Sequence, residues 1–341
     1  VVCAAGRYRW VMVDVLLELP GPEPRTVKLS SPDKVLWPDA PGGAVTKRGL
    51  ADYLIAVSEP FLRLNGDRPM TLQRFPDGVD GEEFFSKRPP RGAPSFLRTV
   101  MCTYPSRRRH DQLVFDEPAA LVWAAQMGTI TFHPWPVRTS NLDNPDEFRI
   151  DLDPQPGRDF RDAVEAALAL REVMAGVGLT AYAKTSGNRG IHVYARIAPT
   201  HEFQDVRHGV IGVARELERR LPDLVTTSWW KEERGARVFV DFNQANRDRT
   251  IAAAYSPRPL PWAPVSTPVS WEELPDVDPR EFQAFADEFG EVMTLADIAV
   301  INDVCGARED PIPGVTGQLV VDTAVAHGAK EVVYVVEKYD L

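Results

Sequence analysis

The sequence predicts a mixed α+β fold, and three observations support this class. Long segments such as residues 159–177 carry apolar side chains at helical spacing, whereas short segments such as residues 147–154 alternate apolar and polar side chains as a strand does. Between residues 141 and 275 these segments follow the order strand, helix, strand, loop, strand, helix, strand. The chain has 341 residues, of which 44% are hydrophobic, so it is long enough to bury a substantial core.

The first 140 residues are expected to form a second α/β layer against that core. Their apolar runs are short and are separated by proline-rich turns. We expect, in chain order, an edge strand over residues 10–19, a helix capped by Thr46 that ends near Pro60, strands over 69–75 and 83–85, a helix over 118–127 and a strand over 129–132.

Residues 141–275 are expected to form the central core of one compact unit, and residues 276–341 an acidic, partly helical terminal segment. The proline-rich passage that ends at Pro268 is poor in backbone donors and predicts no regular structure. The expected elements are strands over residues 147–154, 182–184, 191–196, 238–242 and 251–255, and helices over 159–177, 204–220, from Trp271 to Leu274 and over 278–289.

The formal charge of −10 is unevenly distributed. Residues 268–341 hold sixteen Asp or Glu against four Lys or Arg, so the remainder of the chain is slightly basic. Residues 84–110 contain seven Lys or Arg and no acidic residue. Such a run suits a surface that lies along phosphates, although a solvated basic loop is the ordinary alternative.

Composition excludes several classes of protein. No uninterrupted apolar stretch approaches the roughly 20 residues that a membrane helix needs, and the first residues do not form a signal peptide, so we expect a cytoplasmic protein that binds no membrane. The cysteines, Cys3, Cys102 and Cys305, are far apart and form no CxxC pair. They therefore indicate neither a disulfide framework nor a local zinc knuckle.

Asp151 and Asp153 are the most informative residues of the expected core. Strand alternation places both on one face, opposite Ile150 and Leu152. Aligned carboxylates repel each other, and a shared Mg²⁺ or Mn²⁺ is the usual reason to hold such a pair, although turn chemistry is the common alternative for Asp-x-Asp. Asp241, on a second apolar strand, supplies a third carboxylate and strengthens the metal hypothesis.

Residues 184–192, with the sequence Lys-Thr-Ser-Gly-Asn-Arg-Gly-Ile-His, have the composition of a phosphate-binding loop. Glycines let backbone N–H groups approach phosphate oxygens, and Ser186, Arg189 and His192 can donate further hydrogen bonds. The segment lacks the Walker spacing of a P-loop, and an ordinary hairpin turn with a polar tip is the alternative.

Seven runs in the chain carry a resemblance to a known family. They span residues 33–38, 74–78 with Phe84 and Phe85, 133–135, 151–154, 184–192, 241–246 and 255–266. In this order the sequence resembles the polymerase domain of bacterial ligase D, in the archaeo-eukaryotic primase superfamily, and in particular the stand-alone bacterial primase-polymerases. The resemblance covers about residues 28–275. It implies a primase-polymerase catalytic core with an RRM-like mixed sheet and a packed N-terminal α/β layer.

The resemblance also implies roles for individual residues. Asp151, Asp153 and Asp241 are implied to be catalytic and to bind the metal. The residues implied to bind the nucleotide are His133, Ser186, Gly187, Arg189, His192, Arg234, Gln244 and Arg258, with His133 near the sugar. The residues implied to contact DNA are Lys34 and Lys47 at a downstream 5′-phosphate, and Arg74, Phe84 and Phe85 at the template, where stacking contributes ~1–3 kcal/mol per base.

The function so implied is that of a template-dependent nucleotidyltransferase. It would fill short 5′-phosphorylated gaps by two-metal phosphoryl transfer with Mn²⁺ or Mg²⁺, take NTPs or dNTPs with a preference for ribonucleotides, and serve end joining or excision repair. Gapped or broken double-stranded DNA would be its partner, together with a separate ATP-dependent DNA ligase and Ku. The protein would be a nucleoid-associated monomer.

Three positions depart from the family pattern, and three other functions stay open. Ser31 stands in place of a common asparagine, Gln73 in place of a lysine and Arg189 in place of a lysine. A metal-dependent glycosyltransferase also uses Asp-x-Asp, but it does not need Lys34, Lys47 or the basic run. A metal-dependent nuclease would degrade the primer, and a non-catalytic DNA-gap or DNA-end binding module would not need Asp151.

Overall fold

A six-stranded sheet carries the three predicted carboxylates. The computed structural model describes residues 14–21 and 23–284, which fall within one compact unit, Val1–Phe285. The strand order is β13-β14-β10-β12-β11-β17, and neighbours are antiparallel except for the parallel pair β13 and β14. Its strands are β10 (Glu147–Pro154), β11 (Ala181–Thr185), β12 (Ile191–Arg196), β13 (Val225–Thr226), β14 (Val238–Asp241) and β17 (Pro268–Val269).

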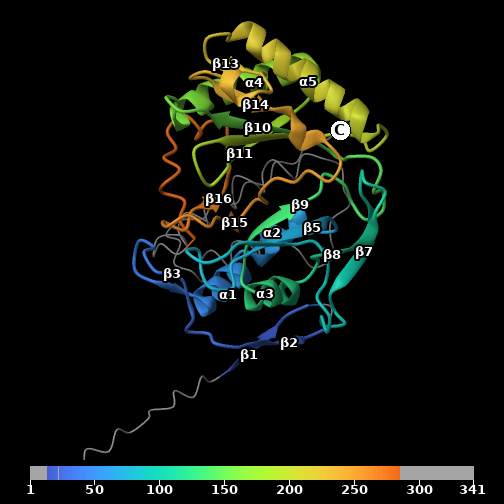
Figure 1. Ribbon diagram of the computed structural model, residues 1–341, viewed down its shortest axis with the longest axis vertical. Helices are drawn as coiled ribbons and strands as arrows, with labels where there is room; N and C mark the ends of the chain where they lie inside the picture. Colours follow the sequence, from blue (N-terminus) through green and yellow to red (C-terminus); the bar gives the residue numbers. More distant parts are fainter. Residues whose placement is uncertain (1–13, 22, 285–341) are drawn as a thin grey trace, which may run out of the picture. The chain divides into compact units, whose positions relative to one another are not determined.

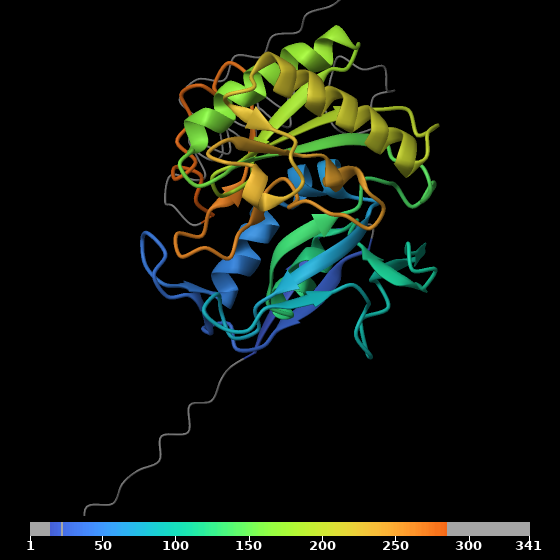
Figure 2. The same ribbon diagram turned by 45° about the horizontal axis from the view of Figure 1, so that its top comes forward.

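Two long helices, α4 (Phe160–Gly176) and α5 (Phe203–Arg220), cover one face of this sheet, as Figures 1 and 2 show. Their apolar side chains recur at helical spacing and pack against Ile150 and Leu152 of β10, both fully buried. Asp159 caps α4 by accepting hydrogen bonds from the backbone N–H groups of Arg161 and Asp162. The helices therefore seal the apolar face and leave the other face of β10 for polar side chains.

The N-terminal layer contains a second, five-stranded sheet. In it β5 pairs with β9 on one side and with β6 and β8 on the other, and β7 extends β8. The strands are β5 (Pro69–Arg74), β6 (Phe84–Ser86), β7 (Arg98–Thr103), β8 (Arg109–Val114) and β9 (Thr129–Pro134).

Three helices and two small hairpin-like sheets complete this layer. Thr46 caps α1 as predicted, since its hydroxyl accepts a hydrogen bond from the N–H of Gly49 at 3.2 Å. Helix α3 is apolar around its circumference and is accordingly buried on all sides. The elements are α1 (Lys47–Ala56), α2 (Ser58–Asn65), α3 (Pro118–Gln126), β1 (Val15–Leu19) with β2 (Arg25–Leu29), and β3 (Val35–Trp37) with β4 (Val45–Thr46).

The chain from residue 251 to residue 266 joins the two layers. The N–H of Ala253 donates to the carbonyl of Phe132 at 2.8 Å, and the hydroxyl of Tyr53 donates to the carbonyl of Tyr255 at 2.8 Å. A short ladder of β15 (Ser256–Pro257) and β16 (Val265–Ser266) follows. This connection places Arg258 at the polar face of the six-stranded sheet, within electrostatic reach of Asp151.

The structure confirms the α+β class and the order of the core, and it corrects several elements. Residues 251–255 form no strand: their backbone N–H groups make single hydrogen bonds to two different strands, Ala253 to β9 and Tyr255 to β16. The proline-rich passage, predicted to be irregular, contains β15, β16 and β17, which are only two residues long, and β15 and β17 each include one proline. The segment from Trp271 to Leu274 and the described part of 278–289 are turns rather than helices. The helix expected to end near Pro60 is two helices, α1 and α2.

None of the helices described within residues 14–284 has the length and apolar character required to span a bilayer. The remainder of two predicted segments, residues 10–13 of the edge strand and residues 285–289 of the last helix, lies outside the described residues.

Candidate active site

Strand register aligns Asp151 with Asp241. The two residues are direct partners in the antiparallel pair of β10 and β14, and Asp153 lies two residues further along β10 on the same face. Asp153 is exposed and Asp151 is partly buried, with 23% of its side chain accessible. The alternation that places Ile150 and Leu152 in the core therefore presents three carboxylates together on the open face.

Burial, followed by the negative charges of Asp241 and Asp153, raises the pKa of Asp151 to about 7. The other two carboxylates accept hydrogen bonds from nearby amides. Gln244 Nε2 donates to Asp241 Oδ2 at 2.9 Å, and Gln155 Nε2 donates to Asp153 Oδ2 at 2.9 Å. These amide donors offset part of the repulsion within the group.

The donor set suits a hard divalent cation, because three carboxylates converge on one face and the ionisation of the central one is opposed by its neighbours. Among residues 14–284, however, no group of three His, Cys, Asp or Glu side chains is already arranged to hold a metal ion.

A hollow of about 200 Å³ opens directly beside the carboxylates. Part of the lining was not predicted: Trp229 and Arg249 come from segments without an obvious chemical pattern, and Asn243 had been assigned no role. The full lining consists of Asp151, Asp153, Trp229, Arg234, Phe239, Asp241, Asn243, Gln244 and Arg249.

On the opposite side of Asp151, β12 supplies His192. His192 is the cross-strand partner of Asp151, and its Nε2 lies 3.5 Å from Asp151 Oδ1. Its Nδ1 lies 2.6 Å from Lys184 Nζ, which in turn lies 2.5 Å from Ser266 Oγ. Lys184 and Ser266, both buried, were not predicted to be site residues. Burial, with Lys184 and Arg258 nearby, depresses the pKa of His192 well below its ordinary value.

The glycine loop curls around a hydroxyl. Ser186 Oγ accepts hydrogen bonds from the backbone N–H groups of Asn188 and Gly190, each at 3.1 Å. Gly187 has φ +73°, and a Cβ there would lie 2.5 Å from Cγ of Arg258. Glycine is therefore required for Arg258 to approach this loop. Arg258 Nε has no hydrogen-bond partner within the described structure, so it is available to an anion.

His133 belongs to the same cluster. Its Nε2 lies 3.2 Å from Gln73 Oε1, and its ring centroid lies 6.0 Å from that of Phe85. Burial, Arg258 and Lys184 lower the pKa of His133 to about 3, so the ring is neutral at neutral pH. Gln73, one of the departures from the family pattern, thus orients His133.

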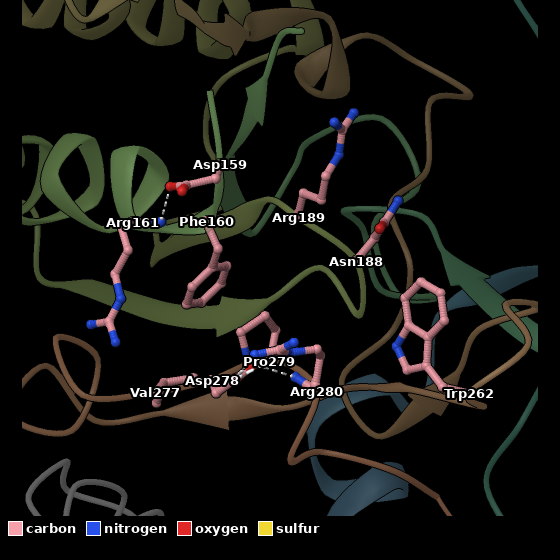
Figure 3. A pocket seen from close by; sticks show the side chains of 10 residues that line it. All are labelled: Asp159, Phe160, Arg161, Asn188, Arg189, Trp262, Val277, Asp278, Pro279 and Arg280. Atoms are coloured by element: carbon pink, nitrogen blue, oxygen red, sulfur yellow. Dashed lines mark hydrogen bonds and ion pairs between the residues drawn. The ribbon is translucent and has the colours of Figure 1, made fainter. Parts of the chain in front are cut away.

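Arg234 and Arg189 are not joined to this cluster by any contact that the described structure contains. Arg234 packs on Phe239, with its guanidinium carbon 3.4 Å from the ring centroid, and lies on the β14 side of the carboxylates. Arg189 is exposed and lines a different hollow, of about 490 Å³, with Asn188 and Trp262. Figure 3 shows its guanidinium extended away from Trp262.

The two predicted phosphate-binding lysines lie together in the N-terminal layer. The backbone N–H of Lys47 donates to the carbonyl of Lys34 at 2.8 Å. Burial and the charge of Lys34 lower the pKa of Lys47, whose Nζ donates to the carbonyl of Ser30 at 2.9 Å. Lys34 Nζ pairs with Asp77 at 2.7 Å. Ser31 adopts φ +51°, a left-handed conformation that asparagine accepts more readily than serine does.

The predicted template-binding aromatics are both exposed. Phe84 and Phe85 of β6 have 46% and 55% of their surface accessible. They face opposite ways on this short strand, and Phe85 is the one beside His133. Arg74 supports the strand, because it donates to the carbonyl of Met127 at 2.8 Å and to Ser86 Oγ at 3.2 Å.

Comparison with known proteins places this geometry in a family. The family model described as "LigD, primase-polymerase domain" matches residues 46–297. The chain belongs to the LigD primase-polymerase domain family. It is 32% identical over 278 residues to the multifunctional non-homologous end joining protein LigD of Mycolicibacterium smegmatis, an alignment that covers 80% of this chain and 36% of that protein.

A solved structure agrees with this membership. The polymerase domain from Mycobacterium tuberculosis ligase D in complex with DNA matches with a TM-score of 0.69 and 32% identity, and the alignment covers 74% of this chain and 90% of that one. The chain spans about a third of the length of the curated LigD proteins that it matches. A separate match of 57 residues, 54% identical, is to the UDP-N-acetylmuramate–L-alanine ligase of Cutibacterium acnes; it covers 17% of this chain and 12% of that enzyme.

Proposed function

We propose that this chain is a DNA-directed nucleotidyltransferase that fills short gaps bearing a downstream 5′-phosphate. The observation that carries the proposal is the cross-strand row in which Asp151 lies between Asp241 on β14 and His192 on β12. This row sets carboxylates beside a cluster of anion-binding groups, which is the combination that nucleotidyl transfer needs. The structural relative, a ligase D polymerase domain, is described in complex with DNA.

The site residues would bind and orient the reactants. A divalent cation held by Asp151, Asp153 and Asp241 would lower the pKa of the attacking hydroxyl and neutralise charge on the triphosphate. Arg258 and the Ser186 hydroxyl would hold the triphosphate. His192, with Nδ1 facing Lys184, would present an Nε2–H donor to the same phosphates.

The DNA would contact the N-terminal layer, residues 1–140, while residues 141–275 carry the chemistry. Lys34 and Lys47 would bind the 5′-phosphate, and Phe84 or Phe85 would stack on the template base at the gap. Nucleotide contacts would also include His133 near the sugar, Gly187, Arg189, Arg234 and Gln244. A preference for ribonucleotides, use of Mn²⁺ or Mg²⁺, and cooperation of the monomer with a separate ligase and Ku belong to this proposal.

Primer extension on gapped duplex DNA tests the catalytic part. With NTPs or dNTPs and Mn²⁺ or Mg²⁺, the wild type should extend the primer as the template directs, and Asp151→Asn should reduce the rate at least ~100-fold. Asp223→Asn, a change at an exposed turn residue, should leave the rate unchanged. No template-directed extension in any condition would refute polymerase activity. Full gap filling by Asp151→Asn would instead show that the catalytic residues lie elsewhere in the chain.

Binding to gaps with and without the 5′-phosphate tests the DNA-binding part. The wild type should prefer the phosphorylated gap, and Lys34→Ala or Lys47→Met should reduce that preference about tenfold, because each removes a charge-assisted hydrogen bond. Lys28→Ala removes a comparable charge from an exposed position on β2 and should not affect the preference. If the wild type bound both gaps with equal affinity, Lys34 and Lys47 would not bind the 5′-phosphate.

A further inference from the structure

Two adjacent tryptophans are exposed beside the carboxylates. Trp229 has 51% and Trp230 has 63% of its surface accessible, in the loop that follows β13. Trp229 also lines the hollow that contains Asp151 and Asp241. Large aromatic side chains are usually buried, so an exposed pair at the rim of a site indicates a surface that a ligand covers.

The loop that carries these tryptophans is held in place. The hydroxyl of Thr227 donates to Glu218 of α5 at 2.5 Å. Arg234, packed on Phe239, donates from Nη2 to the carbonyl of Trp229 at 3.1 Å. The Trp229 ring lies 6.4 Å from that of Phe242, tilted by 39°. One side of Trp229 is therefore supported by the protein while the exposed side remains available, as a stacking surface requires.

The position of this loop next to the sheet indicates which part of the substrate Trp229 would contact. Across the sheet the order is the Trp229 loop after β13, then Asp241 on β14, Asp151 on β10 and His192 on β12. In phosphoryl transfer the attacking oxygen and the leaving group lie on opposite sides of the phosphorus. If His192 and its neighbours hold the leaving pyrophosphate, the strand that supplies the attacking hydroxyl enters from the Trp229 side.

The charges on this side fit a polynucleotide. Arg234 and Arg249 line the same hollow as Trp229, whereas the short 3₁₀ helix η1 (Lys231–Glu233) that follows Trp230 carries one lysine and two glutamates. Cationic side chains next to an exposed aromatic ring are the usual elements of a single-strand binding surface, where the cations contact the backbone and the ring contacts the base.

We propose that Trp229 stacks on the last base of the DNA strand that is extended and that Trp230 widens this platform. The inference rests on the proposed polymerase function, because it takes the leaving group to lie on the His192 side. The platform would align the terminal 3′-hydroxyl with the carboxylates without reading the identity of the base.

The test is a double-mutant cycle between the ring and the base, measured as binding of the full-length protein to a gapped duplex without nucleotide. Trp229→Ala should weaken binding about tenfold, equivalent to about 1.4 kcal/mol. A primer whose 3′-terminal residue lacks its base should weaken wild-type binding by a similar factor and should affect Trp229→Ala little. Trp229→Phe, which keeps a ring, should restore most of the loss.

Catalysis supplies a second measurement. In primer extension, Trp229→Ala should raise the KM for the primer and leave the KM for the nucleotide unchanged, and Tyr182→Ala, a change at an exposed aromatic residue on β11 away from the hollow, should alter neither. Three results would each overturn the proposal. In the first, Trp229→Ala binds the gapped duplex as tightly as the wild type does; in the second, the primer without its terminal base weakens binding of Trp229→Ala as much as binding of the wild type; in the third, Trp229→Ala raises only the KM for the nucleotide. If the wild type showed this coupling between Trp229 and the terminal base but never extended the primer, the polymerase function would be refuted and the stacking role of Trp229 would stand.

Discussion

At the scale of single residues, the site is built from side chains whose charge the fold controls. Asp151 lies between Asp241 on β14 and His192 on β12. His133 and His192 are kept neutral by burial and by nearby cations. Neutral imidazoles donate one N–H and accept at the other nitrogen, so their neighbours decide which nitrogen faces the substrate. Lys184 performs this task for His192 and Gln73 for His133.

The neutral state of His133 predicts a pH dependence of stability. Its pKa is about 3 in the folded protein, below its ordinary value near 6.5. The unfolded chain therefore takes up a proton below about pH 6.5 that the native state does not. This contribution to stability is fully present above pH 6.5 and is lost as the pH falls toward 3, at no more than about 1.4 kcal/mol per pH unit.

Urea unfolding of the wild type and His133→Gln between pH 7 and pH 5 measures this effect. The stability advantage of the wild type should shrink as the pH falls. His201→Gln, at an exposed histidine, should retain the pH dependence of the wild type. A constant difference between the wild type and His133→Gln at both pH values would show that His133 titrates alike in both states.

At the scale of elements, the functional segments are attached to well-defined ends of helices and strands. The glycine loop joins β11 to β12, and helix α4, which follows β10, begins directly after Asp159, whose side chain caps it. The N-cap residue of α5, Glu202, makes no such hydrogen bond. The two long helices that support the site are thus started by different means.

Asp159→Ala should lower the free energy of unfolding by about 1 kcal/mol, because two backbone N–H groups of α4 lose their acceptor. Glu202→Ala is the matched control at α5 and should change stability by less than about 0.5 kcal/mol. Chemical denaturation measures both. If the two substitutions cost the same, the capping box contributes nothing specific to α4.

At the scale of the whole described unit, a buried ionic cluster connects the N-terminal layer to the catalytic sheet. Arg68, just before β5, pairs with Asp146 at 2.5 Å and with Glu147 at 2.7 Å, and its side chain is only 2% exposed. Arg149 of β10 pairs with the same Glu147 and donates to the carbonyl of Pro134 on β9. The cluster holds β9 and β10 together, and these strands carry His133 and Asp151.

Arg68→Met should destabilise the protein by about 3 kcal/mol, because it leaves two largely buried carboxylates without their main partner. The exposed pair of Arg219 with Glu216 is the control, and Arg219→Met should leave stability unchanged within error. Thermal and urea unfolding measure both variants. A neutral Arg68→Met would mean that Arg138 and Arg149 compensate fully for its loss.

The local sequence pattern was sufficient to predict those elements whose structure is decided by residues adjacent in the sequence. Alternation in residues 147–154 predicted that Asp151 and Asp153 share a face, and Thr46 and the helical spacing after it predicted α1. Local pattern failed for residues 251–255 and 278–284, where backbone hydrogen bonds to distant segments replaced regular local ones, and for residues 271–274, which form only turns. Trp229 was missed as a site residue, because nothing adjacent to it in the sequence marks it as such. Lys184 and Ser266 lie within runs that carry the family resemblance, but neither was assigned a role there.

The sequence by itself predicted the fold class, the three carboxylates and the glycine loop, since each follows from side-chain periodicity or from residues within a short run. The family was indicated by a resemblance that seven separate runs carry together. Only the tertiary structure decided that Asp241 and His192 flank Asp151, that Arg258 reaches the glycine loop through the space left by Gly187, and that Trp229 lines the carboxylate hollow. The physical reason is that strand order and register bring together residues far apart in the chain, and local periodicity carries no information about that pairing.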